Sequence, residues 1–212
     1  MSDYKRNQVE EAISGVLGLQ STSEVRTRLK RLLDTDRALG RSLRSNDPER
    51  ANYAFYSADA PGSGVEVWFS AYETFALLNA LRLMAHGWPQ SFAVSVMRRM
   101  RLKLEQEHKW ILRQDPKELF DQEKIRREAR AGDMAFDVTE PVLLTIKSTW
   151  GVRPDQETKP NACAIARGVN EAMNFLKDAG GIGAATMFEL AAVAHSLANA
   201  LAATRPVRRG RH

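Results

Sequence analysis

The chain has 212 residues, of which 43% are hydrophobic and 27% charged, so it is long enough to bury a core without disulfides or metals. Its single cysteine, Cys163, excludes an internal disulfide and fits a reducing compartment, which predicts a cytoplasmic location. No apolar run approaches the roughly 20 residues of a membrane helix, and the net charge of +5 favours a polyanionic partner.

Hydrophobic periodicity predicts two helices near the N-terminus. Apolar residues recur every three or four positions over Asn7–Leu17 and again over Glu24–Leu39. The hydroxyl run Ser21–Ser23 precedes the second helix and can satisfy its free backbone N–H groups. Arg26 and Lys30 lie opposite the apolar stripe of this helix, so we expect it to present basic side chains to solvent.

A small β wing is predicted to follow these helices. Tyr53–Tyr56 and Val65–Phe69 alternate in hydrophobicity like two short strands. Between them, Pro61–Gly64 has the composition of a tight turn. The pattern therefore predicts a hairpin within residues 53–69.

Two longer helices are predicted after the wing. Ser70 can cap the first of them, Ala71–Ala85, and Gly87 can end it. Pro89 has the backbone angle of a first helical turn, which predicts that the next helix covers Gln90–Arg113.

The C-terminal half is predicted to be mostly helical. A charged helix is expected over Lys117–Arg130, and a strand over Val142–Ile146, where apolar and β-branched residues gather. Gly151–Pro160 is interpreted as a polar linker. Two further helices are expected over Asn161–Lys177 and Ala184–Ala203.

These elements predict a mainly α fold with a winged helix-turn-helix-like N-terminal half and a helical C-terminal half. We expect residues 1–115 to form a DNA-binding domain. Residues 116–204 are expected to form a helical domain for dimerisation or interaction, and residues 205–212 a basic, disordered tail.

The sequence carries no motif for enzyme chemistry. Gly180–Gly183 follows a predicted helix instead of a strand and lacks the lysine of a phosphate-binding loop. The four histidines are scattered, so we predict no metal site. Cys163 has no neighbour in the sequence that would lower the pKa of its thiol. We therefore expect a protein that is not an enzyme and uses no cofactor.

Basic residues gather in three clusters. Residues 24–44 hold seven bases against three acids, and the last eight residues hold four arginines and no acid. Residues 98–103 add Arg98, Arg99, Arg101 and Lys103, again without an acid. Two interpretations stay open: a surface for a polyanion, or solvated helix faces with a disordered tail.

The order of elements favours DNA as the polyanion. In a helix-turn-helix protein the second helix enters the major groove, and its early residues meet the base edges. Here those residues are Arg26, Thr27, Lys30 and Arg31. Arginine and lysine contact guanine edges or phosphates, and threonine can contact either.

The chain resembles the MerR-type winged-helix regulators over roughly residues 5–104. The resemblance is carried by Gly64–Tyr72, then Leu77–Met84, then His86–Gln90. In that family a wing with glycine and aromatic residues precedes a helix, a glycine turn and a second helix.

The resemblance implies that the second helix and the wing bind DNA, that a long helix dimerises and that a C-terminal region senses a ligand. It places Arg26, Lys30 and Arg31 on the recognition helix, and Trp68 and Tyr72 near the wing aromatics. The arginine-tyrosine-tyrosine run of the family is missing from this chain.

Our hypothesis is a transcriptional regulator that binds double-stranded DNA as a homodimer, without a membrane partner. Its DNA-binding residues are expected to be Arg26, Thr27, Lys30, Arg31, Trp68 and Tyr72. The alternative is a non-enzymatic helical module for protein–protein interaction, such as an adaptor, in which the basic clusters are merely solvated.

Overall fold

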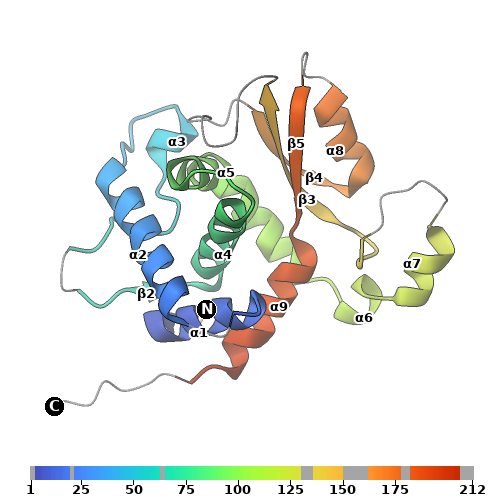
Figure 1. The fold of residues 1–212 in the computed structure, drawn as a ribbon, viewed down its shortest axis with the longest axis horizontal. Coiled ribbons are helices and arrows are strands. Elements are labelled where there is room, and N and C mark those ends of the chain that lie inside the picture. The colour runs from blue at the N-terminus through green and yellow to red at the C-terminus, as the bar shows by residue number, and fades with distance from the viewer. Residues whose placement is uncertain are drawn as a thin grey trace.

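The computed structural model describes the following residues: 3–19, 22–62, 65–129, 136–149, 162–177 and 182–205. This part of the chain is mainly helical, as predicted, and contains two small antiparallel sheets (Figure 1). None of its helices combines the length and the apolar character needed to cross a bilayer.

The first two helices form where the periodicity predicts them. Helix α1 covers Arg6–Val16, and helix α2 covers Thr22–Leu39. Helix α2 buries one apolar stripe and leaves the opposite side in solvent, as expected for an amphipathic surface helix, whereas α1 exposes only Glu11 and Gly15. The buried apolar side chains of α2 are Val25, Leu29, Leu32 and Leu33.

The next two long helices form the centre of the molecule. Helix α4 has the predicted bounds, Ala71–Ala85, and begins with a capping box in which Ser70 and Glu73 exchange hydrogen bonds. After a turn at Gly87, which has a φ of 87°, helix α5 covers Gln90–Ile111. Helix α4 is buried along most of its length, because α1, α2, α5 and the last helix, α9 (Ala191–Ala203), all pack against it.

The prediction of a hairpin within residues 53–69 is wrong. Strand β2, Trp68–Phe69, pairs antiparallel with strand β1, Tyr4–Lys5, at the start of the chain. Tyr53–Tyr56 follows the short helix α3, Pro48–Ala51, and is buried without forming a strand. Side chains bind its backbone in place of a partner strand, so the winged helix-turn-helix arrangement is not confirmed.

The charged region after α5 forms two short helices in place of one. Helix α6 covers Pro116–Leu119 and helix α7 covers Gln122–Glu128. The Asp121 carboxylate accepts hydrogen bonds from the first backbone N–H groups of α7. An aspartate that caps a new helix interrupts the old one, which explains the break.

A three-stranded sheet replaces the start of both predicted C-terminal helices. Strand β3 covers Val142–Thr149, and it pairs antiparallel with β4, Ala162–Arg167, and with β5, Ile182–Glu189. Helix α8, Gly168–Lys177, connects the two outer strands. The predicted linker Gly151–Pro160 lies outside the described residues, as does the tail after residue 205.

The sheet lies between α8 and the central helices (Figure 1). Leu143 and Ala166 face α8, where they contact Ala172. Their neighbours Leu144 and Ile165 point the other way, into the main core. This alternation is the ordinary period of a strand that is buried on both faces.

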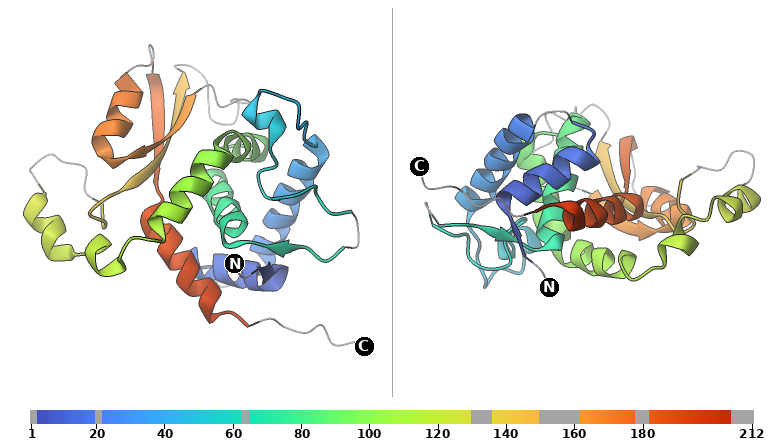
Figure 2. Two further views of the ribbon diagram at one scale, coloured as in Figure 1. Left: turned by 180° about the vertical axis from the view of Figure 1, so that it is seen from behind. Right: turned by 90° about the horizontal axis from the view of Figure 1, so that it is seen from below.

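Helix α9 returns to the N-terminal half. It runs beside α1 and also packs on α4 and α5 (Figure 2). A single apolar cluster contains residues as distant in sequence as Val9 and Leu201. The predicted boundary near residue 115 therefore does not separate two independent cores.

Candidate nucleic-acid interface

Helix α2 lies at the edge of the molecule (Figure 1). It carries four of the predicted DNA contacts. Arg26, Thr27, Lys30 and Arg31 are all exposed, and their spacing places them on adjacent turns of one helix face. The side chain of Arg26 is 62% exposed. We call these four residues the α2 stripe.

The two-stranded ribbon of β1 and β2 carries a second exposed group. Trp68, predicted as a wing contact, is 48% exposed. The Lys5 ammonium lies 4.9 Å from the centre of its indole ring and 3.0 Å from Glu66. The ribbon thus presents a cation and an aromatic ring side by side, although it is built from different strands than predicted.

Arg6 connects this ribbon to the α2 stripe. It follows Lys5 directly in sequence, and its Nη2 donates a hydrogen bond of 3.3 Å to the backbone oxygen of Arg26. Buried Glu10 accepts from Arg6 Nε and Arg26 Nε, each at 2.9 Å. The two guanidinium groups are therefore held in fixed positions. We call the α2 stripe with Lys5, Arg6 and Trp68 the cationic surface.

The middle of α2 carries uncompensated positive charge. Arg28 pairs with Glu24 at 2.6 Å, and Arg37 pairs with Asp34 at 3.2 Å. Lys30 and Arg31 lie between these pairs, and neither side chain forms an ion pair within the described residues. The charge available to a partner is therefore concentrated at the centre of helix α2.

Tyr72 does not belong to this surface. It is buried in the first turn of α4, where its hydroxyl donates a hydrogen bond of 3.2 Å to the backbone oxygen of Arg101. Burial raises the pKa of its phenol. Because α5 covers this face of α4, Tyr72 is a core residue, and its prediction as a DNA contact is wrong.

Two of the four basic residues in the predicted cluster at residues 98–103, Arg98 and Arg101, are buried. Arg98 Nε lies 2.6 Å from Asp36 Oδ1, and Arg98 Nη2 donates to the Asp36 backbone oxygen at 2.6 Å. Arg101 Nη1 donates to the backbone oxygens of Tyr53 and Ala54 at 2.9 and 3.2 Å. Arg98 thus binds α2, and Arg101 binds the irregular segment after α3. Arg99 and Lys103 form ion pairs with Glu49 and Glu107, so little of this charge is free for a partner.

The apolar stripe of α5 serves the core of its own chain. Met97, Leu104 and Ile111 are fully buried, and Met100 packs against them from the margin of the core. In the sequence this stripe spans only about two heptads, which is short for a sustained coiled coil. The structure uses it inside one chain, so a homodimer would need another surface.

The described histidines, His86, His108 and His195, and the cysteine do not form a metal-binding cluster. No group of three His, Cys, Asp or Glu side chains in the described part of the chain could hold a metal. Burial raises the pKa of the Cys163 thiol to about 11, which keeps it protonated and unreactive. His108 is buried with its ring stacked 4.6 Å from that of Phe75.

We expect His108 to make the protein sensitive to mild acid. Burial lowers the pKa of His108 to about 4, whereas the unfolded chain binds this proton near pH 6.5. The stability that neutral, buried His108 contributes is therefore fully present above about pH 6.5, and it is lost as the pH falls toward about 4. His108→Phe should reduce the loss of unfolding free energy between pH 7 and pH 5 by about 2 kcal/mol.

Urea unfolding of both proteins at the two pH values checks this expectation. His86→Phe is the control, because His86 is exposed. An identical loss in the wild type and the His108→Phe variant would show that another group causes the acid sensitivity.

Five of the six predicted contacts are thus exposed and one is buried. The structure adds Lys5 and Arg6, which the sequence offers only as a short basic run before the first helix. Comparison with family models, curated proteins and solved structures finds no match to this chain.

Proposed function

We propose that the protein is a transcriptional regulator that binds double-stranded DNA through the cationic surface. The observation that carries the proposal is the position of Lys30 and Arg31, which are exposed at the centre of an 18-residue helix and have no ion-pair partner within the described residues. A helix of this length is about 27 Å long. Its diameter fits the major groove of B-DNA, which is about 12 Å wide.

Each residue of the surface has a distinct task in this proposal. Lys30 and Arg31 contact base edges or phosphates from the centre of the groove, and Thr27 can contact either. Arg26 is oriented before binding because Glu10 holds its guanidinium at 2.9 Å. Lys5 reaches a flanking phosphate beside Trp68, since a wing-like ribbon next to the groove faces the DNA backbone.

The homodimer stays a prediction of its own. A two-fold pair would present two copies of α2 to half-sites about 34–36 Å apart. Sedimentation of the free protein measures its mass, and footprinting on selected DNA measures the length of the protected site. A monomer that protects a single half-site would contradict the homodimer prediction but not the predicted DNA contact.

The salt dependence of binding tests the proposal. The double variant Lys30→Ala, Arg31→Ala should weaken binding to random duplex DNA. Its plot of log affinity against log salt should be shallower by about 1.8, because each lost phosphate contact removes about 0.9 from the slope. Fluorescence anisotropy with a labelled duplex at several salt concentrations measures both quantities.

The matched control removes two exposed arginines from helix α7. Arg126→Ala, Arg127→Ala makes the same change in net charge far along the chain from α2. The proposal requires this variant to keep nearly the wild-type slope. Equal slopes for the two double variants would mean that net charge alone attracts DNA, and binding that ignores salt would favour a protein–protein adaptor.

A further inference from the structure

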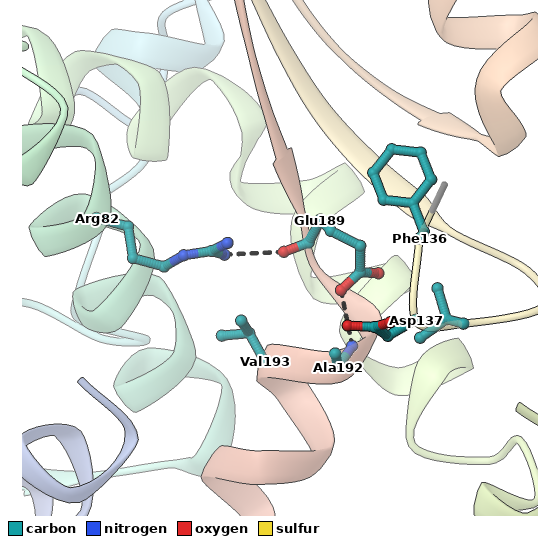
Figure 3. Close-up of a pocket in the computed structure, with 7 residues that line it drawn as sticks. Arg82, Phe136, Asp137, Glu189, Ala192 and Val193 are labelled. Carbon is teal, nitrogen blue, oxygen red and sulfur yellow. Dashed lines mark hydrogen bonds between the residues drawn. The ribbon is translucent and has the colours of Figure 1, made fainter. Parts of the chain in front are cut away.

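A cavity of about 320 Å³ opens between α4, the segment before β3 and the junction of β5 with α9 (Figure 3). None of the residues that line it belongs to the cationic surface. The lining residues are Arg82, Phe136, Asp137, Val138, Glu189, Ala192 and Val193.

Arg82 extends from α4 into this region with part of its hydrogen-bonding capacity unused (Figure 3). Its Nη1 donates to Asn79 Oδ1 and to the Glu189 backbone oxygen, both at 2.9 Å. The Phe188 ring lies 5.2 Å from the guanidinium carbon. These contacts fix the plane of the group, while Nε and Nη2 donate no hydrogen bond within the described residues.

The unused edge of Arg82 has a particular chemical preference. The N–H groups on Nε and Nη2 point in parallel, and a planar fork of this type binds a carboxylate through both oxygens. The Glu189 carboxylate does not fill this role, because it accepts from the backbone N–H groups of Ala191 and Ala192 at 2.6 and 2.9 Å. The fork is therefore open to a carboxylate from outside the chain.

The rest of the lining supplies an opposite charge and an apolar wall. Asp137 lies across from Arg82 in Figure 3, and its exposed carboxylate has no hydrogen-bond or ion-pair partner within the described residues. Phe136, Val138 and Val193 contribute hydrocarbon surface. The volume is at the lower end of the range for small-ligand sites, which is about 300–1,000 Å³.

We propose that this cavity binds an α-amino acid with an apolar side chain, as the zwitterion. The ligand carboxylate binds the Nε and Nη2 edge of Arg82, its ammonium group binds Asp137, and its side chain packs on Phe136 and Val193. Arg82, Asp137 and the apolar surface match the carboxylate, the ammonium group and the side chain of such a ligand. An inorganic anion would leave Asp137 unpaired.

Calorimetric titration of the full-length protein tests the ligand class. The probes are leucine, isoleucine, valine and phenylalanine. For the probe that binds, the carboxamide and the analogue without the amino group should each bind about tenfold more weakly or worse, since each loses a charge-assisted contact. No binding by any of the four amino acids would overturn the proposal, as would a carboxamide that binds as well as the amino acid.

Variants test the site itself. Asp137→Asn and the cavity-filling change Val193→Phe should each weaken binding about tenfold or more. Glu140→Gln, a matched change at an exposed neighbour, should leave affinity unchanged. Arg82→Lys keeps the charge but removes the fork, and its thermal unfolding shows whether the fold survives. If Asp137→Asn and Glu140→Gln bind alike and Val193→Phe binds like the wild type, the ligand lies elsewhere.

Discussion

Replacing Asp36 with alanine is expected to lower the free energy of unfolding by about 3–5 kcal/mol, because it leaves a buried guanidinium without its counter-charge. Asp36 and Arg98 have side chains that are 0% and 3% exposed, and the two groups meet at 2.6 Å. The same carboxylate also accepts from the backbone N–H groups of Ala54 and Phe55 at 3.1 and 3.0 Å. Urea unfolding followed by circular dichroism measures the loss.

The control lies two residues away on the same helix. Asp34 pairs with Arg37 in solvent, so Asp34→Ala should cost no more than about 1 kcal/mol. The double variant Asp36→Leu, Arg98→Met removes both buried charges and should be more stable than Asp36→Ala alone. Equal losses of unfolding free energy for Asp34→Ala and Asp36→Ala would contradict the burial of the pair of Asp36 and Arg98.

The second large effect is expected at Leu197, in the last helix. Leu197 is 1% exposed in the core that α9 shares with α1, α4 and α5. Leu197→Ala should lower the free energy of unfolding by about 2–5 kcal/mol, because it opens a cavity in a packed interior. The free energy of unfolding should fall by the same amount for the N-terminal half as for the C-terminal half.

Tryptophan fluorescence reports that coupling. Three of the four tryptophans, Trp68, Trp88 and Trp110, lie in the first 115 residues. Their unfolding transition should move to lower urea together with the circular dichroism signal. Leu102→Ala, at a leucine that is largely exposed, is the matched control. An unmoved fluorescence transition in Leu197→Ala would mean that the halves unfold independently.

Local signals in the sequence predict the N-terminal helices well. The bounds of α4 follow from the capping pair of Ser70 and Glu73 at one end and from Gly87 after the other. The exposed side of α2 follows from its periodicity, since the positions of Arg26 and Lys30 are fixed once Val25 and Leu29 are buried. No distant contact is needed for either prediction.

The sheet could not be predicted in the same way. Ala162–Arg167 has three alanines in six residues and Ile182–Glu189 has an alanine pair, and alanine favours a helix when considered alone. Both segments become strands because each pairs with Val142–Thr149. Strand formation depends on the partner more than on intrinsic preference, so the partner decides the structure here.

The same limit applies to part of the candidate interface. Arg98 looks like a surface base in the sequence, yet its counter-charge, Asp36, is 62 positions away. Tyr72 looks like a wing aromatic, yet the backbone that it binds belongs to α5. In both cases the residue is buried by a contact with a segment that is distant along the chain. Hydrophobic periodicity is a local pattern and does not predict such a contact.

The packing of α9 on α1 has a consequence for synthesis on the ribosome. Val9 and Ile13 of α1 are fully buried in the shared core, and α9 packs against α1, as do α2 and α4. At about 5–20 residues per second, the nascent chain lacks α9 for roughly 10–35 s after α1 is made. Helix α1 is thus made well before α9, and a translation product that stops before residue 191 lacks this cover and exposes apolar surface of α1 to chaperones and proteases.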